Sequence, residues 1–349
     1  MAKPRLLYIS INDGSDTRIN KEIRTLARDF DIDYVGIGQD DTRAFARQYC
    51  RSFELVRGRH KNPLVFLKYG FRVLKTYYFR RFDSFHLINE NLLLVFLPFL
   101  FWRRRKLVLD VFDSIFLRSG RRLGWLRDLC YQVPKRIIVT DDNRKSLVPA
   151  RFHAKTIVVE NFPYRFTGKL DKTSHPDELV IFYNGSMSRS RGTDLLHQLL
   201  ETDSRVRVKM AGWIYDEPTR QLAQHPRVEF LGVLTQQQST ELAAQCDYIL
   251  SLYEPINENN INASPNKIYD AIQVGTPVII NREVKIAAFV EENQLGYVLE
   301  SFYAEDYPKL VESLVYRKKN YLFSEKLRVR FTWESVEDKL VDAHLKPNP

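Results

Sequence analysis

The strongest constraint on the fold is a repeated alternation of short β-branched runs with longer amphipathic stretches. This pattern is typical of parallel sheets whose strands are joined by helical crossovers. In the first half of the chain it predicts strands at residues 6–10, 33–37, 84–87, 107–111 and 136–139. In the second half it predicts strands at residues 156–160, 179–183, 206–211, 228–231, 248–252 and 277–280. Because the series restarts, we expect an α/β protein with two doubly wound, Rossmann-like domains.

The chain is long enough for both domains to bury a core, since it has 349 residues. A strand-like run ends at Asn161-Phe162-Pro163-Tyr164, and a polar stretch follows it. We therefore expect an N-terminal domain over residues 1–165 and a second domain that begins at residue 166.

Positive charge is concentrated in the first half of the chain. Residues 1–165 hold 32 Lys and Arg against 17 Asp and Glu, whereas residues 166–349 hold 21 against 26. A one-sided basic field suits nucleic acid, an anionic membrane or a phosphate-bearing substrate. We expect no nucleic-acid partner, because the basic stretches carry no recognisable motif and the phosphate-loop patterns lie in the acidic half.

The three cysteines are odd in number and far apart, without a Cys-x-x-Cys or Cys/His cluster. This spacing argues against a disulfide framework or a structural zinc site and favours a reducing cytosol. The longest apolar run, residues 92–102, is about half as long as a membrane-spanning helix requires.

Two loops follow predicted strands, one after the strand at residues 6–10 in the first domain and one after the strand at residues 179–183 in the second domain. In the first loop, Gly14 permits a tight turn, and Ser15 or Asp16 can cap the following helix. This loop is either an ordinary helix cap or a ligand loop, and it lacks the Gly-x-Gly-x-x-Gly pattern of a dehydrogenase. In the second loop, Gly185 is followed by Arg189 and Arg191, which are either exposed or able to hold a diphosphate.

The most specific motif is the stretch from Ser264 to Ile280. Ser264 is a suitable N-cap and Pro265 suits the first helical position, so we expect a helix whose N–H groups are exposed there. Lys267 adds a full charge, and its spacing from Asn266 and Asp270 places the three on one helix face. The alternative is a well-capped helix without a ligand.

In their order and spacing, these motifs resemble nucleotide-sugar glycosyltransferases of the GT-B fold, particularly the mostly retaining glycosyltransferase family four. The resemblance covers nearly the whole chain. It implies two Rossmann-like domains facing a cleft, with the second over residues 166–325. Residues 326–349 are then expected to form a C-terminal helix that returns to the first domain.

The resemblance implies a hexosyltransferase-type enzyme. It would move a sugar from a UDP- or GDP-type nucleotide-diphosphate sugar to a hydroxyl of a glycan or lipid-linked acceptor. Arg191 would hold the donor diphosphate beside Arg189, and Asp270 would hold the ribose. The other donor-binding positions that it implies are Gly185, Gly212, Trp213, Gly232, Leu234, Asn262, Ser264, Asn266 and Lys267.

Two departures from the family pattern affect the catalytic assignments. Asn262 replaces the expected first glutamate, so the contact with the transferred sugar must differ or shift to Glu254 or Glu258. Phe112 replaces a histidine that many relatives carry before the aspartate that is Asp113 here. The catalytic candidates are therefore Asp113, His86 and Asp270, with a structural role for His86 as the alternative, and the acceptor-binding candidates are Gly14, Ser15 and Asp16.

Fixed cations and helix N-termini can stabilise a departing phosphate electrostatically, so we expect retaining transfer without a metal or another cofactor. The Asp31-Ile32-Asp33 sequence matches the metal-binding Asp-x-Asp triad in letters only, since it precedes a first-domain strand.

The segment 63–81 mixes aromatic residues and cations at helical spacing, and residues 92–102 precede three arginines. Such a helix can lie in a membrane interface, or it can be a core helix with one basic face. We expect a cytoplasmic protein bound peripherally to the inner face of the plasma membrane, in cell-surface polysaccharide or glycolipid assembly. The alternatives are a nucleotide-sugar epimerase of the same fold and a non-catalytic GT-B-like binding protein.

Overall fold

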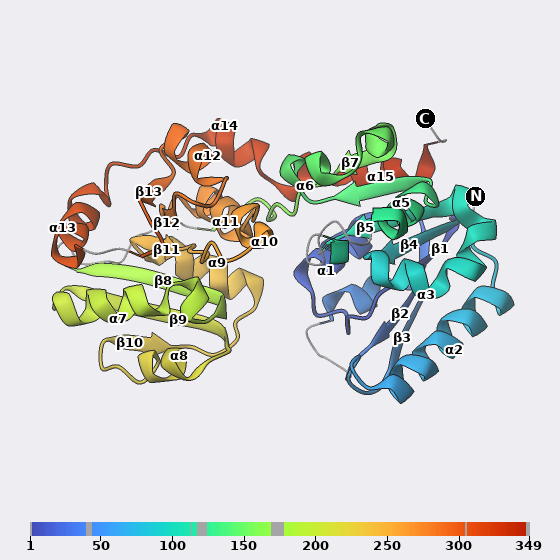
Figure 1. Ribbon diagram of the computed structural model, residues 1–349, viewed down its shortest axis with the longest axis horizontal. Helices are drawn as coiled ribbons and strands as arrows, with labels where there is room; N and C mark the ends of the chain where they lie inside the picture. The colour runs from blue at the N-terminus through green and yellow to red at the C-terminus, as the bar shows by residue number, and fades with distance from the viewer. Residues whose placement is uncertain are drawn as a thin grey trace. The chain divides into compact units, whose positions relative to one another are not determined.

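In the computed structural model the chain forms two compact units. The first comprises residues 1–161 and 336–349, and the second comprises residues 162–335. The structure describes residues 2–39, 44–112, 114–116, 124–168, 178–303 and 306–346. Each unit is built around a parallel sheet (Figure 1).

The sheet of the first unit has the order β3-β2-β1-β4-β5-β6-β7. Its strands are β1 (Arg5–Ile9), β2 (Asp31–Ile37), β3 (Ser52–Val56), β4 (Ser84–Ile88), β5 (Leu107–Val111), β6 (Arg136–Val139) and β7 (Thr156–Val158). The strand order reverses between β1 and β4, which are paired in parallel with Tyr8 opposite His86. This order is that of a doubly wound sheet, whose ligands bind where the order reverses.

Helices cover both faces of this sheet. They are α1 (Thr17–Leu26), α2 (Pro63–Phe79), α3 (Glu90–Leu100), α5 (Gly124–Gln132), α6 (Asp142–Leu147) and α15 (Glu337–Leu345), with the short helices η1 (Phe45–Tyr49), η2 (Phe101–Lys106) and η4 (Ala150–Lys155). Tyr69 and Val73 of α2 and Phe96 of α3 pack on one face, against strand residues that include Leu7 and Leu87. Side chains of α1 and α15 pack on the other face, where His86 points.

The strand predicted at residues 156–160 belongs to the sheet of the first unit. It was grouped with the strands of the second half, although the expected boundary at residue 165 leaves it in the N-terminal domain, and β7 pairs in parallel with β6, with Val139 opposite Val158. The amide of Val159 continues this ladder to the carbonyl of Val139. Because a β-branched run fits either sheet, only the pairing decides where it belongs.

The sheet of the second unit has the order β10-β9-β8-β11-β12-β13. Its strands are β8 (Leu179–Met187), β9 (Val206–Ile214), β10 (Val228–Phe230), β11 (Tyr248–Leu250), β12 (Val278–Asn281) and β13 (Gly296–Leu299). Its helices are η5 (Arg189–Arg191), α7 (Thr193–Thr202), α8 (Glu217–Leu222), α9 (Gln236–Gln245), α10 (Glu258–Ile261), α11 (Asn266–Val274), α12 (Ala287–Glu292), α13 (Tyr307–Arg317), α14 (Glu325–Arg330) and η6 (Trp333–Ser335).

The C-terminal segment, expected as one helix over residues 326–349, is divided between the units. Residues 326–335 stay in the second unit, where the Phe331 ring packs edge-on against Phe162 and Phe289. Only α15 lies in the first unit, where Glu337 accepts hydrogen bonds from Thr25 of α1 and from Arg28, which follows the end of α1. The aromatic packing of Phe331 explains why the chain leaves the second unit later than expected.

In the part of the chain that the structure describes, no helix is both long enough and apolar enough to cross a membrane.

Candidate functional site

The candidate site of the second unit lies where its strand order reverses, between β8 and β11. Parallel strands present their carboxyl ends at one sheet edge, so the segments that follow β8 and β11 meet there. The segment after β8 carries Arg189 and Arg191, and the segment after β11 carries Tyr253. Helix α11 supplies Lys267 to the same edge, because its ammonium group bonds the carbonyl of Leu250.

Two glycines allow the ends of β8 and β9 to approach closely. Gly185 lies opposite Gly212 in the parallel register, and both have positive φ angles, +84° and +137°. A Cβ atom on Gly212 would lie 2.1 Å from the carbonyl oxygen of Gly185. At Gly185 itself, a Cβ atom would meet only Lys267, at 3.9 Å. Glycine is therefore required at Gly212 by contact and favoured at Gly185 by backbone conformation.

Tyr183 holds the loop after β8 in place. Its hydroxyl accepts a hydrogen bond from the amide of Ser188 and donates one to the carbonyl of the same residue, both at 2.9 Å. The two arginines of the loop then have different surroundings. Arg189 is exposed and forms an ion pair of 2.9 Å with Asp194.

Arg191 is held between an aromatic ring and an amide. Its guanidinium carbon lies 3.9 Å from the centre of the Tyr253 ring. One of its terminal nitrogens donates to Asn260 at 3.4 Å, whereas the other is buried and has no hydrogen-bond partner in the described chain. Asn260 is fixed in turn by donating to the carbonyl of Glu254. A stacked guanidinium with unused donors is suited to phosphate oxygens.

Lys267 is the second cation of the site. Its ammonium nitrogen donates to the Leu250 carbonyl at 2.9 Å and lies 5.7 Å from the centre of the Tyr183 ring. Burial and the nearby charge of Arg191 lower the pKa of Lys267 to about 7, although Asp270 opposes this shift. The ammonium group therefore gains or loses a proton near neutral pH, which an approaching anion would influence.

Helix α11 begins slightly later than expected. It starts at Asn266, and Pro265 rather than Ser264 occupies the N-cap position. The hydroxyl of Ser264, the predicted cap, is hydrogen-bonded to the Tyr269 hydroxyl at 3.0 Å instead. Within the described residues, no side chain caps this end of the helix. Asn266 is exposed, and Asp270 is half-buried one turn further along.

The other expected donor positions lie around the same sheet edge. Gly212 donates its amide hydrogen to the carbonyl of Gly232 at 2.8 Å, which links β9 to the segment that contains Leu234. Trp213 is about half exposed. Asn262 is buried, and its amide nitrogen donates to both the carbonyl and the carboxylate of Glu258, at 2.7 and 3.0 Å.

Solved structures match this architecture over nearly the whole chain. HepE from Anabaena, determined in complex with UDP, has a TM-score of 0.70 at 15% identity, covering 97% of this chain and 98% of its own. Sucrose-phosphate synthase from Thermosynechococcus elongatus has a TM-score of 0.69 at 11% identity over the same shares. The lipopolysaccharide outer core galactosyltransferase WaaB has a TM-score of 0.63 at 13% identity, also over 97% and 98%. No family model and no curated protein sequence matches the chain.

The chain has the GT-B fold. The expectation of two doubly wound domains with GT-B architecture is thereby confirmed. Because the sequence identities to these structures are low, the similarity establishes the fold. The roles of the individual side chains in the candidate sites stay predictions.

Three residues that shape the candidate site in the second unit were not among the sequence candidates. Tyr253 and Asn260 position Arg191, and Tyr183 positions the loop that carries it. Tyr253 could have been found, because it follows directly after a strand at the edge where ligands bind. Asn260 could not, since it lies in a short polar run without periodicity.

In the first unit, the loop after β1 satisfies its own backbone. Asn12 accepts from the amide of Gly14, and Asp13 accepts from the amide and hydroxyl of Ser15. Asp16 caps α1 by accepting from the amides of Arg18 and Ile19. Of the two interpretations of this loop, the structure thus shows the capped helix. The acceptor-binding role of Gly14, Ser15 and Asp16 stays a prediction, and these amides do not favour it.

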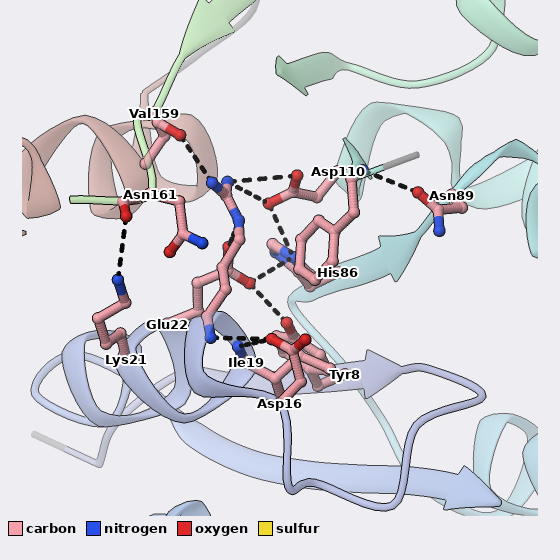
Figure 2. A network of polar contacts seen from close by, with 12 residues as sticks. Tyr8, Asp16, Ile19, Lys21, Glu22, His86, Asn89, Asp110, Val159 and Asn161 are labelled. Carbon is pink, nitrogen blue, oxygen red and sulfur yellow. Dashed lines mark hydrogen bonds and ion pairs between the residues drawn. The ribbon is translucent and has the colours of Figure 1, made fainter. Parts of the chain in front are cut away.

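His86 lies within β4 rather than at its end, as part of a buried polar network (Figure 2). Its Nε2 atom is 3.4 Å from Glu22 and 3.6 Å from Asp110, and its Nδ1 atom is 3.0 Å from His344 of α15. The Tyr8 ring stacks on it with centroids 4.4 Å apart. This placement favours the structural alternative for His86 over catalysis.

Arg18 is the cation at the centre of this network. It donates to Glu22 at 2.7 Å, to Asp110 at 3.1 Å and to the carbonyl of Val159 at 2.9 Å (Figure 2). Burial raises the pKa of Glu22, but the Arg18 charge and the contacts with His86 outweigh it and lower this pKa to about 2. Burial raises the pKa of Asp110 well above its usual value despite Arg18.

Glu22, His86 and Asp110 bring potential metal-ligand atoms within 4.8 Å of one another. The guanidinium of Arg18 already bonds both carboxylates, so the cluster has a cation and does not fit a metal site. Asp113, the other first-unit catalytic candidate, lies outside the described residues. Its neighbour Phe112 lies under Arg18, whose guanidinium carbon is 4.9 Å from the ring centre.

Proposed function

We propose that the protein is a glycosyltransferase that takes a sugar from a UDP- or GDP-type nucleotide-diphosphate sugar. The observation that supports this proposal most strongly is that Arg191, Lys267 and the uncapped start of α11 converge at one sheet edge. Two fixed cations and free helix N–H groups match a diphosphate. Structural neighbours support the proposal, since HepE was determined with UDP and with UDP and glucose.

The proposed reaction breaks the bond between the anomeric carbon and the phosphate oxygen and forms one to an acceptor hydroxyl oxygen. Arg191 and Lys267 stabilise the negative charge that develops on the leaving phosphate, which then takes up the hydroxyl proton. Asp270 holds the ribose hydroxyls. We propose transfer with retention and without metal, and no cofactor beyond the donor, because these cations supply the charge that a metal would supply.

We further propose that the acceptor is a glycan or lipid-linked hydroxyl in cell-surface polysaccharide or glycolipid assembly, and that the protein binds peripherally to the inner face of the plasma membrane. The excess of cations in residues 1–165 supports an anionic surface as partner. The similarity to WaaB, an outer core galactosyltransferase, is consistent with such an acceptor.

A second candidate is a nucleotide-sugar epimerase. A Listeria monocytogenes protein provisionally assigned as a UDP-N-acetylglucosamine 2-epimerase matches with a TM-score of 0.63 at 11% identity. An epimerase converts the donor without an acceptor, so analysis of products from donor alone distinguishes the two. A non-catalytic binder, suggested by Asn262 and Phe112, would bind donor and yield no product.

The test is thermal unfolding with UDP-, GDP-, dTDP- and CMP-linked sugars and the bare nucleotides. A ligand at 100 times its dissociation constant stabilises by about 2.7 kcal/mol. We expect stabilisation with one nucleotide class, lost in Lys267→Ala and Arg191→Ala. Turnover with that donor should survive excess chelator. The absence of stabilisation by every donor would contradict the proposal, and activity lost in chelator and restored by magnesium would contradict metal independence.

A further inference from the structure

Helix α2 of the first unit exposes an apolar face. Only Tyr69, Val73 and Thr76 of its 17 residues are buried. On the opposite side, Leu64, Leu67, Phe71 and Tyr78 are exposed at spacings of three, four and seven residues, which align on one face. Phe71 exposes 67% of its surface and the adjoining Phe79 exposes 84%. We call these five side chains the α2 face.

A cationic groove borders the α2 face. It lies between β3 and α2, encloses about 440 Å³ and is lined by Leu55, Val56, Arg57, Lys68, Phe71, Arg72 and Lys75. Arg72 is paired with Glu54 at 2.8 Å, whereas Arg57, Lys68 and Lys75 form no ion pair within the described residues. Three cations in one hollow, without an ion pair in the part of the chain that the structure describes, favour the binding of an anion. Phe71 belongs to both the groove and the α2 face, so the two are continuous.

More exposed aromatic and basic side chains lie beside the C-terminal end of α2. The Tyr78 ring contacts the ring of Phe99 in α3, and the Tyr77 hydroxyl donates to the Phe99 carbonyl. The chain continues from α3 directly into η2, where Trp102 exposes 81% of its surface. Four consecutive cations, residues 103–106, follow Trp102. In Figure 1, α2 and α3 lie on the same side of the first unit's sheet.

We propose that the α2 face docks on an anionic membrane, with a lipid phosphate bound in the groove between β3 and α2. Apolar side chains beside unpaired cations match the boundary between acyl chains and charged head groups. This inference specifies the membrane association of the proposed function and rests on it, but the surface is separate from the donor site. The exposure of most of α2 favours this interpretation over the alternative of a core helix with one basic face.

A nucleic acid fits this surface less well. Cations alone would satisfy its phosphates, whereas Leu64 and Leu67 would be left exposed to water and cannot stack on bases as aromatic rings do. A bilayer interface accepts both kinds of side chain, because leucine and phenylalanine enter the acyl boundary while lysine contacts head groups.

The test is flotation of the full chain with phosphatidylcholine vesicles that contain or lack phosphatidylglycerol, at low and high salt. The test variant is Phe71→Ser/Lys75→Gln. The matched control is Tyr316→Ser/Lys319→Gln in the second unit, where Tyr316 exposes 79% of its surface and Lys319 is also exposed. Both variants change one exposed aromatic residue and one exposed lysine, and thermal unfolding checks that each is folded.

We expect the wild type and the control to bind vesicles that contain phosphatidylglycerol, and binding to weaken at high salt. The test variant should bind at least tenfold more weakly, because each cation near such a surface contributes about fivefold and Phe71 adds apolar contact. Inorganic phosphate should not displace the bound protein, since it lacks the acyl boundary that the α2 face contacts.

No binding to anionic vesicles at low salt, equal binding of the test variant, displacement by inorganic phosphate, or retention on RNA in place of vesicles would each overturn the inference. Donor-dependent thermal stabilisation is measured on the same samples. Vesicle binding lost in the test variant with donor stabilisation intact supports the inference. Donor stabilisation absent in the wild type, with vesicle binding intact, counts against the proposed function alone.

Discussion

The ammonium group of Lys267 donates a hydrogen bond of 2.9 Å to the carbonyl oxygen of Leu250, the last residue of β11. This bond fixes a titratable cation at the carboxyl edge of the second sheet. Burial and the charge of Arg191 lower the pKa of Lys267 to about 7. A ligand that carries negative charge will stabilise the protonated form, so its binding is coupled to proton uptake.

Donor affinity should therefore depend on pH. Below pH 7 Lys267 is already charged, and above pH 7 binding must first protonate it. The dissociation constant for a nucleotide-diphosphate sugar should rise by up to tenfold per pH unit above 7, until the raised pKa of the complex is reached. Calorimetric titrations from pH 6 to 9 measure this. Lys267→Met should bind the donor weakly, and its dissociation constant should not change with pH in this way. Lys319→Gln should keep the pH dependence of the wild type. A wild-type dissociation constant that does not change with pH would contradict the prediction.

The two arginines after β8 should contribute unequally. Arg191 stacks on Tyr253 and has a buried nitrogen without a hydrogen-bond partner among the described residues, whereas Arg189 is exposed and paired with Asp194. Arg191→Lys keeps the positive charge but loses the two N–H groups with which a guanidinium can bind a phosphate. The affinity for the nucleotide-sugar donor should therefore fall roughly 10- to 100-fold. Arg189→Lys should change it less than threefold. Equal losses in direct binding measurements would show that both arginines hold the donor.

Glu258 should supply the sugar contact that the sequence pattern assigns to position 262. Its carboxylate accepts from Asn262 at 3.0 Å, whereas Glu254 is engaged with the Tyr303 hydroxyl at 2.8 Å. Glu258→Gln should weaken binding of the nucleotide sugar about tenfold and leave the bare nucleotide within twofold. Glu254→Gln should affect neither. A loss shared equally by both ligands would place Glu258 outside the sugar contact.

Local patterns in the sequence predicted much of this architecture. The strand series follows from periodicity, and Gly275 ends α11 in the left-handed conformation that is typical of glycine after a helix. Residues 156–160 were correctly predicted as a strand, but their sheet depends on long-range pairing that local sequence does not encode. The strands β3 and β13, short runs at the edges of their sheets, were missed because so few residues carry a weak pattern signal.

Side-chain roles were harder to predict than elements. His86 was expected as a catalytic candidate, but it lies inside β4, where Glu22 of α1 and His344 of α15 contact its ring nitrogens. Its partner His344 is 258 residues away, so no spacing argument could join them. Asp16 was correctly offered as a cap, because helix capping depends only on adjacent residues.

Arg18 should be essential for the stability of the first unit. Arg18→Met leaves the Glu22 carboxylate buried without its cation, so we expect a loss of about 3–5 kcal/mol in unfolding free energy. Arg51→Met removes an exposed pair with Asp31 and should cost less than about 1 kcal/mol. The urea unfolding transition of the first unit measures both losses of unfolding free energy. Similar values for the two variants would show that the network adapts to the loss of its cation.

The buried imidazole of His344 should make the first unit sensitive to mild acid. Its Nδ1 atom is 2.7 Å from the Ser84 hydroxyl, and its Nε2 atom faces His86. Burial, followed by the charges of His86 and Lys135, lowers the pKa of His344 well below its usual value, with Glu22 opposing. Helix α15 therefore docks with this ring neutral.

The sign of the pH dependence follows from this direction. In the unfolded chain a histidine has a pKa of about 6.5 and takes up a proton below it, whereas the folded unit keeps His344 neutral. Stability is thus fully present above about pH 6.5 and is lost as pH falls, by up to about 1.4 kcal/mol per pH unit.

In urea unfolding between pH 7.5 and 5, the unfolding free energy of His344→Gln should change less steeply with pH than that of the wild type. His60→Gln, which changes an exposed histidine, should leave the slope unchanged. If the wild type and His344→Gln lose stability equally on acidification, the docked helix does not exclude a proton from this ring, and the acid sensitivity belongs to other groups.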